Sequence, residues 1–207
     1  MTSEAYVKAQ NGAVRLAVRD LRRYWASLDL SDGVGVRVAL EAYWPRLLAT
    51  YGEITATLAA DRFEELVGLP ATMVRPVDAE RANARMRWAI GPLFGIEGDA
   101  IARMLQLTDE LVKQPGRSTT IRSATENRIR FARVPTGAET CNWCLMLGGR
   151  GAVYRSARNA GQMSSFHPDC DCRVEPVRSD DDLNRLRDTG YDPDALFAQY
   201  LATTSAS

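Results

Sequence analysis

The sequence has little histidine and little lysine, and no long apolar run. His167 is its single histidine, so a His-Glu-x-x-His metalloprotease site is excluded. Lys8 and Lys113 are the lysines, and the other basic residues are arginines. No apolar run approaches the ~18–20 residues that a membrane span needs, and the N-terminus lacks the basic-then-apolar layout of a signal peptide. These absences predict a soluble protein made in a reducing compartment, with no membrane partner.

The charge is balanced, with 26 basic and 26 acidic residues in 207. A neutral chain is a poor bulk binder of nucleic acid, because non-specific affinity comes from phosphates neutralised by cations. Hydrophobic residues make up 45% of the chain, which is enough to bury a core. The length suits one large domain, or a main domain with a small satellite.

Apolar residues recur at three- and four-residue steps in residues 1–116, which predicts a helical assembly domain. The two clearest stripes are Val14, Val18, Leu21, Trp25 and Leu28, then Val36, Leu40, Tyr43, Leu47, Tyr51, Ile54 and Leu58. Asp78 and Asp99 are good N-caps for two further helices. Pro45 is expected to kink or split the second helix, and Pro115-Gly116 to end the helical region. The expected fold is mainly α, with long helices packed as an irregular bundle.

Residues 117–178 predict a small, loop-rich α+β module that is rich in arginine. A short helix around residues 123–130 is expected to lead into a strand at 131–134. Residues 152–154 are expected to form another short strand. The module has too few apolar residues to hold itself together, so we expect a bound metal to staple it. Residues 179–207 predict an acidic linker and a docking helix that starts at Asp192-Pro193-Asp194.

The four cysteines and the histidine all fall in the predicted module. Cys141 and Cys144 form a Cys-x-x-Cys pair, and His167, Cys170 and Cys172 form a second group. Such pairing in a chain without a signal peptide favours a structural Zn²⁺ site over disulfides. Five donors compete for four places, and the spacing does not decide which four bind. The alternative is a set of reduced structural thiols, or adventitious disulfides formed after oxidation.

The enzyme classes that use these residue types fit poorly, so the sequence favours a protein without catalytic residues. A cytidine deaminase needs a His-x-Glu half before its Cys-x-x-Cys, whereas His167 follows the pair here. The glycine loop at 148–151 lacks the Lys-Ser/Thr of a phosphate-binding loop. A hydrolase pairing Cys144 or Cys170 with His167, or using zinc, stays open as a less favoured reading.

Arginines of the predicted module suggest a zinc-ribbon-like DNA-binding protein as the alternative function, acting on a packaged genome or as a regulator. The arginines in question are Arg128, Arg130, Arg133, Arg150, Arg155 and Arg158. Tyr154 lies among them. The simpler interpretation is that these side chains pair with Glu126, Glu139, Asp169 and the acidic tail, because the chain as a whole is neutral.

The C-terminal part resembles a known family in several short motifs. They run from Phe131-Ala-Arg-Val-Pro-Thr-Gly137 through Thr140-Cys-Asn-Trp-Cys144 and Arg150-Gly-Ala-Val-Tyr154 to His167-Pro-Asp-Cys-Asp-Cys-Arg-Val-Glu-Pro176. In these motifs the chain resembles the MuF-like minor head proteins of tailed bacteriophages, of the type found in actinobacterial phages and prophages. Cys141, Cys144, His167, Cys170 and Cys172 match the Cys and His positions of the motif.

The resemblance implies a minor capsid component, present in few copies inside the head and in the host cytoplasm during assembly. It implies association with the portal, with the major capsid protein or with both, and a role in head morphogenesis, genome packaging or delivery. Packaged DNA is a further possible partner. The long apolar stripes predict a homo-oligomer or an assembly with the symmetry of the portal. No catalytic activity is implied.

Overall fold

The computed structural model describes residues 1–137, 140–156, 158–160, 170 and 172–204, and these are mostly helical. In chain order the elements are α1 (Ser3–Trp25), α2 (Gly33–Val67), α3 (Ala79–Ala89), the 3₁₀ helix η1 (Gly91–Phe94), α4 (Ala100–Glu126), β1 (Arg130–Val134), α5 (Asn142–Gly149), β2 (Arg173–Val177), α6 (Asp180–Asp188) and α7 (Pro193–Thr204). The expected class, mainly α with a small α+β module near the C-terminus, is confirmed.

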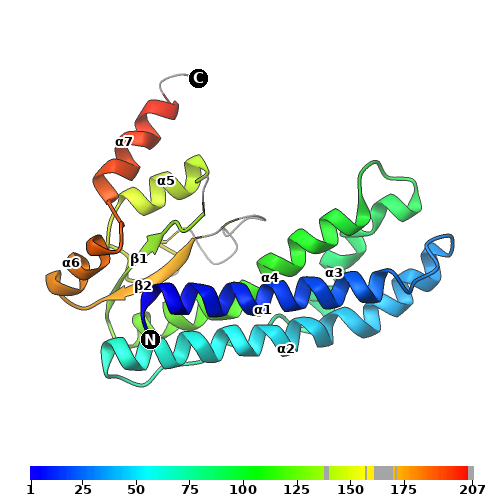
Figure 1. Ribbon diagram of the computed structural model, residues 1–207, viewed down its shortest axis with the longest axis horizontal. Helices are drawn as coiled ribbons and strands as arrows, with labels where there is room; N and C mark the ends of the chain where they lie inside the picture. The colour runs from blue at the N-terminus through cyan, green and yellow to red at the C-terminus, as the bar shows by residue number, and fades with distance from the viewer. Residues whose placement is uncertain (138–139, 157, 161–169, 171, 205–207) are drawn as a thin grey trace.

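Three long helices, α1, α2 and α4, lie side by side and make an elongated bundle, with α3 packed against α2 and α4 (Figure 1). The stripes expected from the sequence supply part of its core, including the fully buried Leu21 and Leu40, whereas Ile54 of the second stripe is 42% exposed. Trp44 is also fully buried, and its indole Nε1 donates to Thr108 Oγ1 at 2.9 Å, so the polar group of this large side chain is satisfied.

Neither internal proline interrupts its helix. α2 is one element through Pro45, and α4 continues through Pro115 and Gly116 to Glu126. The expected end of the helical region at Pro115 is therefore wrong, and the expected short helix at 123–130 is the last part of α4. Packing against α2 explains the difference. A Cβ on Gly116 would lie 2.8 Å from the carbonyl oxygen of Thr55, so glycine lets the two backbones approach closely.

The helix starts expected from capping residues are confirmed. Asp78 Oδ1 accepts from the backbone N–H of Arg81, and Asp99 Oδ1 accepts from that of Ala102. Asp192 Oδ1 accepts from the backbone N–H groups of Asp194 and Ala195, both at 3.0 Å. Each carboxylate satisfies donors that a helix start leaves without partners, which is why a local pattern suffices to find them.

The C-terminal module sits at one end of the bundle and contains the two strands (Figure 1). β1 and β2 pair antiparallel, with Arg130 opposite Val177 and Val134 opposite Arg173. The expected strand at 131–134 is confirmed, whereas of residues 152–154 Tyr154 alone forms a bridge, to Phe131. Helix α7 packs on α5, where Gly148 and Gly149 leave room for it. Its Phe197 is 44% exposed, so this apolar face is only partly covered.

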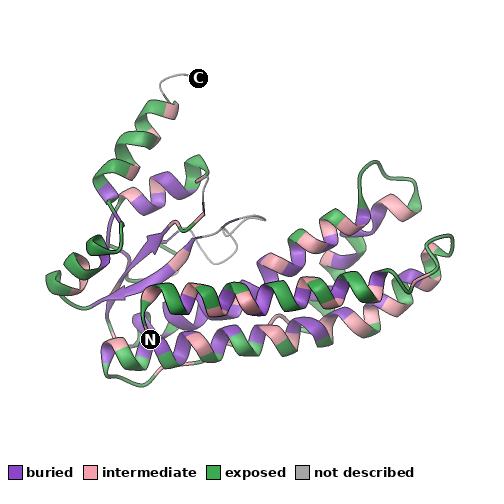
Figure 2. Cartoon of the chain, in the orientation of Figure 1, coloured by how far each residue is buried: buried purple, intermediate pink, exposed green. Residues whose placement is uncertain are grey.

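The core of the module is continuous with the end of the bundle. Phe63 and Val67 of α2 and Ile121 of α4 pack in one buried cluster with Phe131 and Val174 of the strands. Figure 2 shows this buried seam between the helices and the sheet. The module thus obtains from the helices the apolar contacts that its own sequence lacks. The division into 1–116, 117–178 and 179–207 stays a prediction.

Within the part of the chain that the structure describes, no helix has the length and apolar character of a membrane span.

Candidate metal centre

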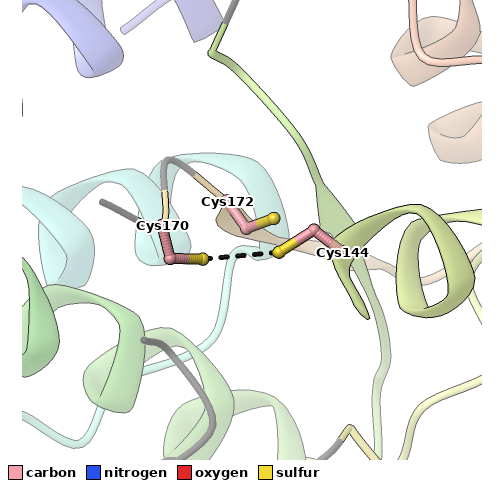
Figure 3. Close-up of side chains that lie close together, drawn as sticks. All are labelled: Cys144, Cys170 and Cys172. Atoms are coloured by element: carbon pink, nitrogen blue, oxygen red, sulfur yellow. Dashed lines mark hydrogen bonds between the residues drawn. The ribbon is translucent and has the colours of Figure 1, made fainter. Parts of the chain in front are cut away.

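Three cysteine side chains converge at the buried seam. The Sγ atoms of Cys144, Cys170 and Cys172 all lie within 4.8 Å of one another, and each residue is 3% exposed. Cys144 Sγ and Cys170 Sγ are 3.5 Å apart (Figure 3). All four cysteines are described and none is in a disulfide. The arrangement therefore brings together two halves of the motif that are far apart in the sequence.

Local structure places each thiol. Cys144 is in the first turn of α5, and Cys172 directly precedes β2, so strand pairing with β1 fixes its position. Cys141 is the N-cap of α5, exposed, and its Sγ accepts from the backbone N–H of Cys144 at 3.4 Å. The structure brings together three of the predicted ligands and keeps Cys141 one turn away. His167 lies outside the described residues.

Two buried arginines surround the thiols. Arg133 of β1 is fully buried, and its Nη2 lies 3.8 Å from Cys144 Sγ and 3.7 Å from Cys170 Sγ. Its Nη1 donates to the carbonyl of Ala160 at 3.2 Å. Arg117 of α4 donates to the carbonyls of Cys170 and Cys172, through Nη2 and Nε respectively. Guanidinium groups beside sulfur favour the thiolate form, which is the form that binds metals.

The three thiols shift one another's pKa values, because hydrogen bonds join them. Hydrogen bonds from Cys144, which has the larger effect, and from Cys172 lower the pKa of Cys170 well below the usual value of a thiol. The reciprocal hydrogen bond to Cys170 raises the pKa of Cys144. A bound divalent cation would allow all three to ionise, because it supplies the missing positive charge.

The chemistry of the cluster suits binding better than catalysis. Within the described residues the group contains cysteines alone, with no carboxylate or imidazole beside it. Thiolates are soft ligands that select Zn²⁺ and similar ions. Catalysis by the Cys–His pair suggested by the sequence depends on His167, which is not described. The residues present therefore fit a structural metal site.

The structure corrects part of the predicted DNA-binding surface. Arg133 is buried against the thiols and does not belong to any surface, and Tyr154 is 1% exposed and cannot stack on a base. Arg130 is partly buried and lies 3.6 Å from Asp180 of the acidic tail. Arg128, Arg150, Arg155 and Arg158 are exposed. Glu126, an expected acidic partner for them, instead pairs with Arg122, and Glu139 and Asp169 lie outside the described residues.

Sequence reasoning missed the role of Arg117 and misread that of Arg133. Spacing rules find the cysteines because metal ligands recur at short intervals, but no such rule links Arg117 to Cys170 across 53 residues. One feature of the sequence did indicate that Arg133 is buried. It follows two apolar residues of the predicted strand and precedes a third, Val134, in a segment that is buried almost throughout.

Fold and site define a mainly helical protein with a buried group of three cysteines that could hold a metal ion, between the helices and the strands. The family model of the VG15 protein matches residues 2–203, and the chain belongs to this family. It is also 35% identical over 75 residues to the Gene 15 protein of Mycobacterium phage D29. That match covers 23% of this chain and 27% of the relative, so the chain spans about a quarter of that protein's length.

These matches identify a protein of bacteriophage type. No solved structure matches the chain.

Proposed function

We propose that this protein is a minor capsid protein of MuF-like type, which works in head morphogenesis inside the phage head and contacts the portal or the major capsid protein. The VG15 family match and the phage relative support the phage setting. Three cysteines of the motif that suggested MuF-like proteins, Cys144, Cys170 and Cys172, belong to the buried cluster between the helices and the strands. In this proposal the elongated helical bundle makes the assembly contacts. The metal-stapled module stabilises the other end of the bundle.

The observation that carries the assembly role is an apolar end of the bundle, which we call the distal end. It comprises the start of α2 and the segment from the end of α3 through η1 to Ile96. There Val34 is 62% exposed, Trp88 64%, Phe94 49% and Ile96 59%. The two segments touch, since a Cβ on Gly33 would lie 3.3 Å from the ring of Phe94. Exposed apolar groups gathered in this way are typical of protein interaction sites.

Co-assembly tests this role. The chain is co-expressed with the portal and major capsid proteins of its own phage, and the assembled shells are isolated by sedimentation. We expect the chain to travel with the shells, and the double variant Trp88→Ser, Phe94→Ser to be lost from them. The matched control is Ile54→Ser, Leu69→Ser, which removes two side chains of 42% exposure elsewhere on the bundle. Equal incorporation of both double variants would contradict the distal end as the contact.

We further propose that the three-cysteine cluster is a structural Zn²⁺ site. Cys144, Cys170 and Cys172 would hold the ion, which would join α5 to the entry of β2. Elemental analysis of the purified chain is expected to give one zinc per chain. Removal of the metal with a strong chelator is expected to change the near-UV circular dichroism, while most of the far-UV signal of the long helices persists. A metal-free protein with unchanged spectra would contradict the proposal.

One observation favours DNA as a second partner, on a surface other than the predicted one. Lys8, Arg15 and Arg22 lie at seven-residue intervals on α1, and all three are exposed. Arg19 and Arg23 are exposed beside them, and Arg19 pairs with Asp20. The row spans ~21 Å at ~1.5 Å per residue. Duplex DNA presents a charge every ~1.7 Å, so such a row can meet several phosphates.

The matched test compares two triple variants with the same change of charge, using fluorescence anisotropy on a short duplex. Lys8→Gln, Arg15→Gln, Arg22→Gln alters the α1 row, and Arg150→Gln, Arg155→Gln, Arg158→Gln alters the module. If α1 binds DNA, the first variant alone lowers the slope of log affinity against log salt by about 2.7, which is ~0.9 per phosphate contact. No binding by the unaltered chain, or equal losses in both variants, would contradict it.

A further inference from the structure

We infer that the metal centre is a four-thiolate site, in which Cys141 is the fourth ligand and the buried Arg133 and Arg117 compensate its charge. The inference rests on the proposed metal site and settles which of the five sequence donors complete it. His167 is then not required. Two independent features lead to this assignment, namely the position of Cys141 and the charges buried around the cluster.

Cys141 is already placed in the turn that carries a ligand. Its Sγ accepts the N–H of Cys144, whose own Sγ belongs to the cluster. Residues three apart at a helix start lie on the same side of the helix, so both thiols of the pair face one region. The N-terminus of α5 also favours a thiolate at Cys141, because its N–H groups and dipole stabilise negative charge.

The charges around the cluster match a dianion. Zn²⁺ with four thiolates carries a net charge of −2, and with three thiolates and a neutral imidazole it carries −1. Two guanidinium groups are buried at the cluster, with Arg133 fully buried and Arg117 5% exposed. Among the acids that the structure describes, Asp109 acts on Arg117, and it also pairs with Lys113 at 2.8 Å. A buried charge is costly unless it is compensated, so two cations suit a dianionic centre.

The two arginines therefore act as positioning residues rather than as ligands. Arg133 spans Cys144 and Cys170 with one nitrogen, which fixes the relative position of sulfurs from α5 and from the segment before β2. Arg117 holds the carbonyls of Cys170 and Cys172 from the side of α4. Hydrogen bonds that hold metal ligands in place from outside the coordination shell typically change the affinity for the metal 10–100-fold.

Cobalt substitution of the full-length chain tests the ligand set, because the sulfur-to-Co²⁺ charge-transfer absorption rises with the number of thiolates. Cys141→Ser is expected to lower this absorption by about a quarter, as four thiolates become three. It is also expected to weaken Zn²⁺ binding by more than about 100-fold. Serine is a preferred N-cap, so α5 keeps its cap in this variant and far-UV circular dichroism should be unchanged. His167→Gln is the matched control, and its spectrum and affinity should equal those of the unaltered chain.

The reverse pattern, with His167→Gln altering the spectrum and Cys141→Ser leaving it unchanged, would overturn the four-thiolate assignment while leaving the metal site itself standing. No Co²⁺ or Zn²⁺ binding by the unaltered chain would overturn the metal site and this inference together. For the arginines, Arg133→Met is expected to lower Zn²⁺ affinity about 10–100-fold and Arg133→Lys to restore part of it. Equal affinity of the methionine variant and the unaltered chain would contradict charge compensation.

Discussion

At the scale of single residues, a buried ion cluster joins the bundle to the sheet. Arg62 of α2 donates to both carboxylate oxygens of Glu175, at 2.9 and 3.1 Å, and the two side chains are 8% and 3% exposed. Arg173 Nε lies 2.7 Å from the same carboxylate, as an ion pair without hydrogen-bond geometry. Tyr6 of α1 lies under Arg62, with 5.0 Å between Cζ and the ring centroid. One carboxylate therefore compensates the buried Arg62 and the partly buried Arg173.

Glu175→Gln should destabilise the protein severely, because it leaves both arginines without their shared counter-charge. We expect a loss of about 3–5 kcal/mol in the free energy of unfolding, measured by urea denaturation. The control is Glu126→Gln, which breaks the exposed pair with Arg122 and should cost less than about 1 kcal/mol. Similar midpoints for the two variants would show that burial of the cluster is not what makes it important.

Asp182 gives the module a dependence on acid pH. Burial raises the pKa of its carboxyl, but hydrogen bonds from Arg178 and Arg185 outweigh burial and lower it from 3.8 to about 2. A carboxyl with a lower pKa in the folded state contributes stability above its unfolded pKa, and loses it as pH falls through the folded pKa. Asp182→Asn should thus cost on the order of 1–2 kcal/mol near pH 6.

The cost of Asp182→Asn should shrink as the pH falls from about 4 to about 2, because both side chains are then uncharged. Thermal denaturation of variant and parent across this range measures it. A constant difference in melting temperature from pH 6 to pH 2 would contradict the assigned cause.

At the scale of elements, helix starts follow rules that depend on neighbouring residues, whereas the end of α4 depends on packing between distant segments. The capping aspartates at 78, 99 and 192 were predictable from sequence, since a cap depends on neighbours within three residues. The end of α4 was not, because Pro115 and Gly116 carry stop signals that distant packing overrides. Likewise the motif spacing found the cysteines, whereas the burial of Arg133 depends on β1, α5 and the segment before β2 meeting. Sequence therefore indicates the donors of the site but not their surroundings.

Two glycines inside helices should respond oppositely to alanine. A Cβ on Gly12 of α1 would meet nothing closer than Arg15 Nη2 at 3.9 Å, so Gly12→Ala should gain about 0.5–1 kcal/mol from reduced chain entropy. Gly116→Ala should lose about 1–3 kcal/mol, since its Cβ would lie 2.8 Å from the Thr55 carbonyl. Melting temperatures check both, and changes of the same sign would contradict the account of α2–α4 packing.

At the scale of the whole molecule, the shared core predicts that bundle and module unfold together. Phe63, Val67 and Ile121 belong to the helices yet pack with the strands and the cysteines. Calorimetry of the metal-loaded chain should show one transition, with equal calorimetric and van't Hoff enthalpies. A fragment of residues 127–207 should stay unfolded even with zinc, because it lacks those side chains. Two separate transitions, or a folded fragment, would instead support independent domains.

If the protein is a component of the phage head, as we propose, purified phage particles must contain it. The measurement is quantitative mass spectrometry of density-purified particles from a strain that carries this sequence. The proposed role predicts a few to a few dozen copies per particle, at a constant ratio to the portal protein. Absence from particles, with the protein abundant in the infected cell, would contradict a virion role.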